Sequence, residues 1–254
     1  MTEKEMTEYL CSRGYGVIPP SQYMIDMEDS FKEIWEMVSP YTMTSVERGY
    51  SLYKAVDYIV ANDIPGDLVE CGVWKGGSCM LMALALKELG AAERRIHLYD
   101  TFEGMPEPGD NDYIAWNGRP VSEKWKSDQQ GLTSNFTDWA VSLENVRENI
   151  LRTGYPEKNL EFIAGPVEET LNLHTPERIS LLRLDTDWYE STKAELEYLY
   201  PLLSAEGVLV IDDYGHFTGA KKAVDEYFET ISPSILLNRI DYTGRIAIKT
   251  ETAE

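Results

Sequence analysis

One stretch of the chain decides the fold: Leu68-Val69-Glu70-Cys71-Gly72-Val73-Trp74-Lys75-Gly76-Gly77-Ser78. It begins as a short apolar run, passes through a glycine cluster and continues into the strongly apolar segment 78–89, which is typical of a buried helix. A strand that leads through glycines into a helix offers a ligand close backbone approach and a helix N-terminus. The glycine spacing matches neither a phosphate-binding P-loop nor the G-x-G-x-x-G dinucleotide fingerprint.

Four more apolar runs follow this stretch and alternate with helical segments. The runs cover 96–99, 160–164, 179–184 and 208–211. The helical segments cover 142–152, 167–172, 190–199 and 219–228. This alternation predicts an α/β fold in which a parallel sheet is covered by helices on both faces. The last part of the chain, 235–249, reads as a closing hairpin around Tyr242-Thr243-Gly244.

The chain divides by pattern into a helical front section and an α/β core. Apolar residues at helical spacing predict helices over 22–38 and from Thr44 to Ile59, so we assign residues 1–64 to an N-terminal helical section and 65–254 to the core. Residues 101–140 interrupt the alternation. They are rich in proline and glycine but carry three tryptophans, Trp116, Trp125 and Trp139, which favours a lid over a plain surface loop.

Composition narrows the range of functions and partners that the chain can have. The chain has 254 residues with 23 basic and 44 acidic side chains, a formal charge of −21, and 43% of its residues are hydrophobic. That hydrophobic content excludes intrinsic disorder, and the negative charge argues against nucleic-acid and anionic-membrane partners. No apolar run approaches the roughly 18 residues of a membrane span. Because the three cysteines form no metal-binding pair or disulfide framework, we expect a reducing, cytoplasmic location.

Ligands of an open parallel sheet bind at the carboxyl ends of its strands. The candidate cofactor-binding residues at these ends are Glu70, Gly72, Val73, Trp74, Gly76, Gly77, Ser78, Asp100, Thr101, Phe102, Gly165, Val167 and Asp185. A carboxylate that ends the second strand can accept hydrogen bonds from a ribose diol, which suits Asp100. An acid before the glycines suits a cationic amino-acid group, so Glu70 favours S-adenosylmethionine over a dinucleotide.

Four aspartates follow the fourth and fifth strands: Asp185, Asp187, Asp212 and Asp213. Carboxylates gathered there would repel one another, and a divalent cation such as Mg²⁺ would remove the conflict. Capping of the following helices accounts for one aspartate at each strand end but not for two pairs. His216 follows the second pair and is either a general base, a substrate contact or a structural residue.

Four motifs occur together and in order: Glu70-x-Gly72-Val73-Trp74-Lys75-Gly76-Gly77, Asp100-Thr101-Phe102-x-Gly104-Met105-Pro106, Leu184-Asp185-x-Asp187-x-Tyr189 and Ile211-Asp212-Asp213-Tyr214. As a set they resemble the macrocin O-methyltransferase family over residues 42–228. The resemblance implies a class I methyltransferase fold with a mostly parallel seven-stranded sheet, S-adenosylmethionine as donor and a homo-oligomer. It also implies that Glu70, Gly72 and Asp100 hold the donor, and that Asp185, Asp212 and Asp213 hold Mg²⁺ or another divalent cation.

The family methylates sugar hydroxyls in natural-product pathways, so we expect a small-molecule sugar or glycoside as acceptor. The acceptor could be a nucleotide-linked deoxyhexose, a glycosylated natural product or a polysaccharide unit. We expect catalysis at Asp185, Asp187 and His216, with Asp187 or His216 as the base and Asp187 alternatively a metal ligand. Two alternatives stay open: a metal-dependent methyltransferase for catechol-type phenols, and a non-catalytic nucleotide- or metal-binding module.

Overall fold

The structure is a computed structural model that describes residues 2–17, 23–131, 139–231 and 234–250. The chain forms two compact units, Met1–Glu33 and Ile34–Glu254. The larger unit contains the sheet and every residue of the candidate site. The predicted domain division at residue 64 stays a prediction.

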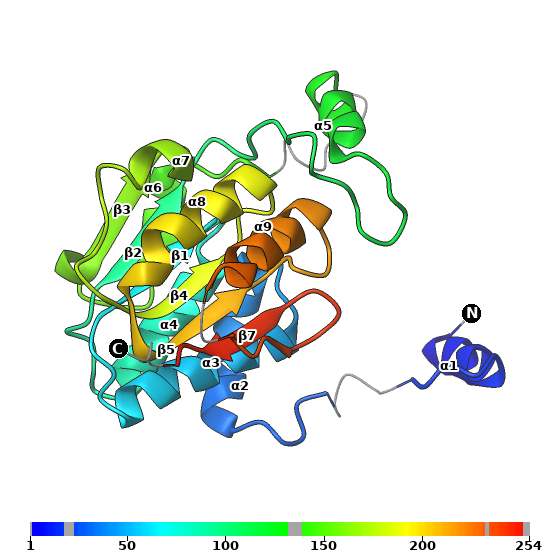
Figure 1. Cartoon of the computed structure of the whole chain (residues 1–254). Helices are drawn as coiled ribbons and strands as arrows, with labels where there is room; N and C mark the ends of the chain where they lie inside the picture. The colour runs from blue at the N-terminus through cyan, green and yellow to red at the C-terminus, as the bar shows by residue number, and fades with distance from the viewer. Residues whose placement is uncertain (1, 18–22, 132–138, 232–233, 251–254) are drawn as a thin grey trace. The chain divides into compact units, whose positions relative to one another are not determined.

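A seven-stranded sheet forms the centre of the larger unit, in the order β3-β2-β1-β4-β5-β7-β6 (Figure 1). The strands are β1 (Asp67–Cys71), β2 (Ile96–Asp100), β3 (Leu160–Ala164), β4 (Ile179–Leu184), β5 (Leu203–Ile211), β6 (Asn238–Arg239) and β7 (Arg245–Ile248). The first five pair in parallel, and β7 is antiparallel to both β5 and β6. The predicted α/β class and the mostly parallel seven-stranded sheet are therefore confirmed.

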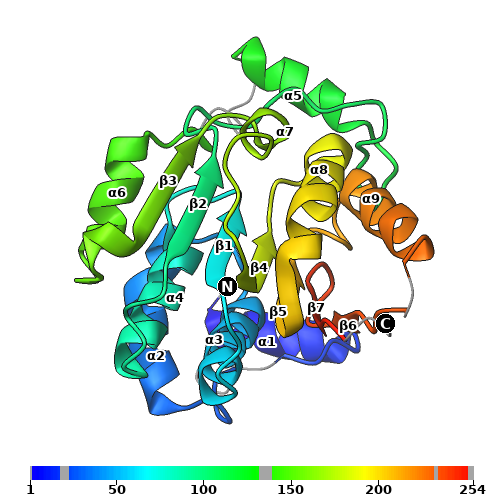
Figure 2. The ribbon, with the colours of Figure 1, turned by 60° about the vertical axis from the view of Figure 1, so that its left-hand side comes forward.

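Helices lie on both faces of this sheet (Figure 2). The structure gives α1 (Glu3–Ser12), α2 (Asp29–Val38), α3 (Val46–Ala61), α4 (Gly77–Glu88), α5 (Val121–Gln129), α6 (Leu143–Leu151), α7 (Val167–Thr170), α8 (Tyr189–Leu199) and α9 (Thr218–Glu229). Short 3-10 turns cover Ser39–Tyr41, Glu157–Asn159 and Tyr200–Leu202. Helices α3 and α4 pack together, as do α8 and α9. Right-handed crossovers place the two pairs on opposite faces, because the chain leaves β1 toward β2 but leaves β4 toward β5.

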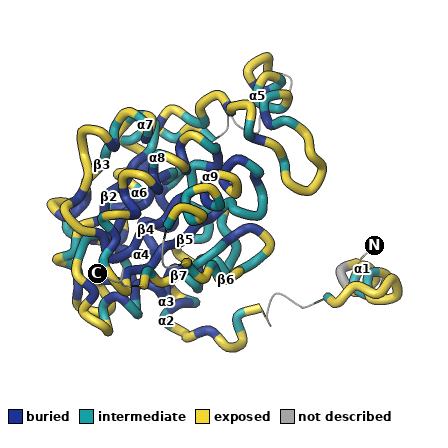
Figure 3. The backbone as a smooth tube through the Cα atoms, in the orientation of Figure 1, coloured by how far each residue is buried: buried dark blue, intermediate teal, exposed yellow. Residues whose placement is uncertain are grey.

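The core lies where the inner strands meet the helices, and Figure 3 shows these strands as buried. Strand β4 is buried along its whole length, as the near-continuous apolar runs of a parallel sheet predict. One charged residue breaks that pattern: Arg183 is only 2% exposed. A buried guanidinium needs anionic partners, and these lie in the candidate site.

The front of the chain differs from the predicted helix over 22–38. Helix α2 begins only at Asp29, because Tyr23 to Met27 form turns in which the Met27 amide donates to the Met24 carbonyl. Gln22 lies outside the described residues. Helix α1 was not predicted, although Thr2 and Glu5 form a capping box whose spacing is visible in the sequence.

Candidate functional site

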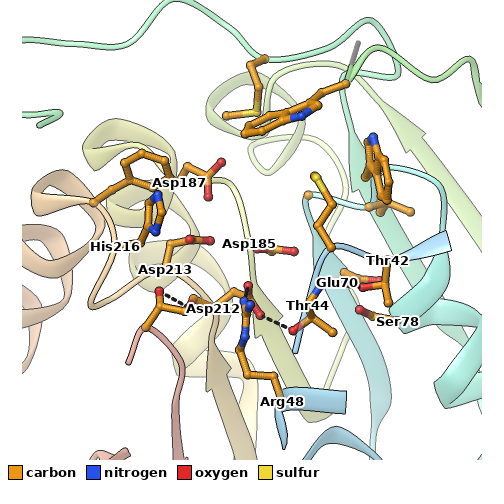
Figure 4. A pocket seen from close by; sticks show the side chains of 18 of the residues that line it. Thr42, Thr44, Arg48, Glu70, Ser78, Asp185, Asp187, Asp212, Asp213 and His216 are labelled. Carbon is orange, nitrogen blue, oxygen red and sulfur yellow. Dashed lines mark hydrogen bonds and ion pairs between the residues drawn. The ribbon is translucent and has the colours of Figure 1, made fainter. Parts of the chain in front are cut away.

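A cavity of about 420 Å³ lies at the carboxyl ends of β1, β4 and β5 (Figure 4). Its wall gathers side chains that are far apart in the sequence, among them Thr44, Arg48, Glu70, Ser78, Asp185, Asp187, Asp213 and His216. Trp116, Lys124 and Trp139 of the 101–140 segment also line it. Many of the predicted strand-end residues and part of the predicted lid therefore surround one space.

The glycine turn after β1 requires glycine at its first position. Gly72 has φ +81°, and a Cβ placed there would lie 2.0 Å from the carbonyl oxygen of Asp185. The turn thus packs directly against the backbone that follows β4, with only hydrogen on Gly72 to separate them. The close approach needs an unsubstituted Cα and a left-handed conformation, which only glycine supplies at low cost.

Asp100 orders the same turn from the end of β2. Its Oδ2 accepts hydrogen bonds from the amides of Val73 at 2.6 Å and Trp74 at 3.1 Å, and its Oδ1 accepts one from Phe102 at 2.8 Å. The carboxylate therefore fixes the loops after β1 and β2 relative to each other. It also lines the cavity, where it remains a candidate ribose contact.

A smaller cavity of about 60 Å³ adjoins the first and shares Gly72, Asp100 and Asp185 with it. Thr101, Gly165 and Val167 line this second space. Three of the candidate cofactor residues, Gly76, Gly77 and Phe102, line neither cavity in the part of the chain that the structure describes. Gly77 instead packs on the Tyr41 backbone and the Thr42 side chain, both of which a Cβ would meet at 2.6 Å.

Three carboxylates converge in the larger cavity: Asp185, Asp187 and Asp213 each place an oxygen within 4.8 Å of the other two. Asp187 reaches this position through a left-handed backbone with φ +70°. Burial raises the pKa of all three carboxyls, that of Asp187 to about 8, and their mutual repulsion raises the pKa of Asp185 and Asp213 further. Fully ionised, the cluster would hold more negative charge than its surroundings balance, so without a cation its carboxyls retain protons.

Asp212 lies apart from this cluster although it neighbours Asp213. Its Oδ1 accepts a hydrogen bond from Arg183 Nη2 at 2.5 Å, and its Oδ2 accepts one from Arg48 Nη1 of α3. Thr44 also lies 3.5 Å from Oδ1 (Figure 4). Both carboxylate oxygens of Asp212 are therefore engaged by arginines.

Arg183 connects carboxylates from the ends of β1, β4 and β5, a role that was not predicted. Its Nη1 lies 2.6 Å from Glu70 Oε1 and 2.6 Å from Asp185 Oδ2, while its Nη2 donates to Asp212 Oδ1. Glu70 is the strand partner of Arg183, and its other oxygen accepts a hydrogen bond from the Cys79 thiol. The visible signal was a lone arginine in a mostly apolar strand, but its partners come from three strand ends.

His216 borders the cavity beside the acid cluster (Figure 4). Its Nδ1 lies 2.9 Å from the Tyr242 hydroxyl, and Trp116 meets its ring edge-on with the ring centres 4.5 Å apart. Burial, together with the positive charges of Arg48 and Lys124, lowers the pKa of His216 below its ordinary value of 6.5. The imidazole is therefore neutral at pH 7 and able to accept a proton.

The raised pKa values predict how pH affects the metal-free protein. Folded Asp187, with its pKa raised to about 8, keeps its proton up to about that pH, whereas an unfolded aspartate loses it near its ordinary pKa of 3.8, so stability falls as pH rises between these values. We expect the Tm of EDTA-treated protein to drop by on the order of 5 °C from pH 5 to pH 8.5, measured by calorimetry. Asp187→Asn should flatten this slope, and a Tm that rises over the range would contradict the charge balance described above.

The strand order, the antiparallel β7 and a cavity at the carboxyl ends of β1 and β4 define a class I methyltransferase. The model of the family described as macrocin-O-methyltransferase (TylF) matches residues 31–247. The chain belongs to this family and is an S-adenosylmethionine-dependent O-methyltransferase.

Similar proteins with assigned reactions support this placement. The 8-demethyl-8-(2,3-dimethoxy-alpha-L-rhamnosyl)-tetracenomycin-C 4'-O-methyltransferase of Streptomyces olivaceus is 36% identical over 83% of this chain and 76% of its own length. The demethyldecarbamoylnovobiocin O-methyltransferase of Streptomyces niveus is 33% identical over 80% and 74%. The solved structure of the O-methyltransferase NovP superposes with a TM-score of 0.72 at 32% identity, covering 83% of each chain.

Within the described residues, no helix is both long enough and apolar enough to cross a membrane.

Proposed function

We propose that the enzyme transfers a methyl group from S-adenosylmethionine to a hydroxyl of a deoxysugar, free as a nucleotide sugar or attached to a natural product. One observation carries the proposal: a single cavity joins the predicted donor residues to three converging carboxylates and the lid. The name of the Streptomyces olivaceus relative specifies methylation on a rhamnosyl group, which supports a sugar acceptor.

The donor is proposed to lie along the two adjoining cavities. Glu70 and the Gly72 turn would face its methionine end, Asp100 its ribose, and the Gly165–Val167 segment its base. The turn suits this use because Gly72 brings backbone close to the ligand without a side chain.

The acid cluster fits a divalent cation because three oxygens converge without enough positive charge around them. We propose that Asp185, Asp187 and Asp213 hold Mg²⁺. The geometry favours Asp187 over Asp212, whose oxygens already face two arginines, so the assignment of Asp212 as a ligand stays a prediction from the sequence. A bound Mg²⁺ lowers the pKa of a coordinated hydroxyl and balances the charge that develops on its oxygen.

His216 is the proposed base. If its Nδ1–H donates to the Tyr242 hydroxyl, Nε2 keeps a lone pair for the proton of the sugar hydroxyl. The sugar oxygen then forms a bond to the methyl carbon while the carbon–sulfur bond breaks, which leaves neutral S-adenosylhomocysteine. Asp187, the other candidate base, is placed within the metal cluster in this scheme.

Product analysis tests the proposed function. The enzyme is incubated with labelled donor and Mg²⁺ and with nucleotide sugars, rhamnosides and catechol, and products are identified by mass spectrometry. We expect a methylated sugar, no methylated catechol, and loss of at least about 99% of the activity in EDTA that excess Mg²⁺ restores. Catechol belongs in the panel because Trp116 and Trp139 line the cavity and could hold a flat ring. Activity that survives complete chelation would overturn the metal assignment.

A further inference from the structure

The 109–121 loop of the lid carries a buried carboxylate outside the site described above. Asp112 is only 2% exposed, although the residues on either side of it in the loop are not buried. Its Oδ2 accepts a hydrogen bond from the Gly109 amide at 2.7 Å, which closes the start of the loop. Its Oδ1 accepts one from the Tyr189 amide at 2.9 Å, which ties the loop to another element.

Tyr189 is the first residue of α8, and the residue before it, Trp188, provides no side-chain cap for that helix. Asp112 supplies the missing cap from the lid, with its negative charge at the positive end of the helix. Helix α8 begins two residues after Asp187. The lid is therefore fixed to the turn that carries one of the three clustered acids.

The next residues of the loop pair with the segment that leads into α9. Ile114 forms a bridge with Phe217, the Ala115 amide donates to the His216 carbonyl at 2.9 Å, and the Thr218 amide donates to the Tyr113 carbonyl at 3.0 Å. These bonds reach the residue proposed as the base. The loop thus contacts both chain segments that follow β4 and β5.

The packing around Asp112 leaves no spare room. A Cβ on Gly219 of α9 would lie 1.8 Å from Asp112 Oδ1 and 2.9 Å from the Tyr189 nitrogen. Gly219 has no left-handed φ, so its small size, and not its conformational freedom, is what this position uses. The lid carboxylate and the first turns of α8 and α9 meet at one point.

We propose that Asp112 is a positioning residue for the acceptor: it holds the 109–121 loop so that Ile114, Trp116 and Val121 form the acceptor side of the larger cavity. These three residues line that cavity, while no residue of the loop lines the smaller cavity, which is assigned to the base of the donor. The inference rests on the proposed function, because it needs the larger cavity to take the sugar beside the methionine end of the donor. Because the loop lies away from the smaller cavity, a change at Asp112 should weaken acceptor binding more than donor binding.

Two variants test the inference, one by changing Asp112 itself and the other by changing a residue packed against it. Asp112→Asn keeps the shape but can accept only one of the two amide hydrogen bonds, and Gly219→Ala displaces the carboxylate while leaving Asp112 in place. Asp110→Asn is the matched control, since it makes the same charge change at an exposed position of the same loop. Three quantities are measured: acceptor KM with the panel sugar methylated fastest, S-adenosylhomocysteine Kd by calorimetry, and amide hydrogen exchange of residues 109–121 and 189.

We expect both variants to raise acceptor KM about tenfold or more, to change the S-adenosylhomocysteine Kd less than about twofold, and to speed amide exchange in the loop. Asp110→Asn should leave all three quantities unchanged. Unchanged exchange in Asp112→Asn would overturn the inference, as would a donor Kd that weakens as much as acceptor KM. The exchange measurement needs no acceptor, so a wrong sugar assignment and a wrong role for Asp112 give different results.

Discussion

Asp213→Asn is expected to lower methyl transfer on the order of a thousandfold while making the metal-free protein more stable. The two effects have one cause. Asp213 lies with Asp185 and Asp187 in a cluster whose burial and mutual repulsion raise the pKa of its carboxyls. Removing one charge relieves the repulsion but leaves two of the three oxygens proposed to hold Mg²⁺.

The measurement combines activity with thermal unfolding at pH 8 in EDTA and in Mg²⁺. We expect Mg²⁺ to raise the Tm of the wild-type protein and to have little effect on Asp213→Asn. Asp57→Asn is the matched control, because Asp57 pairs with Lys54 at a partly exposed position of α3 and such pairs contribute about 0–1 kcal/mol. A variant that is inactive but still gains Tm from Mg²⁺ would show that Asp213 is not a ligand.

The strand ends could be predicted because parallel strands deliver their carboxyl ends to one edge of a sheet. Glu70, Asp100, Asp185 and Asp213 were placed together on this ground, and the structure puts them around one cavity. The sequence could not show which of the four aspartates cluster together, because Asp212 and Asp213 are adjacent in the chain but have different surroundings. Asp212 meets Arg48 and Arg183, two arginines that no short-range pattern connects to it.

The lid shows the same limit. The lid was predicted from a long segment that interrupts the alternation of strands and helices and carries three tryptophans, but its attachment could not be predicted. The bonds of Asp112 to Tyr189 and of Ala115 to His216 join residues roughly 80 to 100 positions apart. Likewise, helix α5 inside the lid was missed, because its nine residues bury only Val121 and Asp128 and so leave little apolar periodicity.

Arg183→Met is expected to be the most destabilising single change at the site, costing about 3–5 kcal/mol of unfolding free energy. Arg183 is 2% exposed and touches Glu70, Asp185 and Asp212. Methionine fills much of the volume but leaves these carboxylates without their shared cation. Arg183→Lys should recover only part of the loss, because a single ammonium cannot reproduce the fork that reaches three strand ends.

Urea unfolding at pH 7.5 and pH 5 measures the effect. Arg183 lowers the pKa of Glu70 and Asp185, so without it these two acids bind protons more readily in the folded state and the loss should shrink at pH 5. Arg147→Met is the control, since Arg147 pairs with Glu157 at the surface and should cost less than about 1 kcal/mol. Adding Glu70→Gln to Arg183→Met should restore part of the stability, because it removes one of the unpaired charges. If Arg183→Met lowers the unfolding free energy no more than Arg147→Met does, the buried arginine does not hold Glu70, Asp185 and Asp212 together.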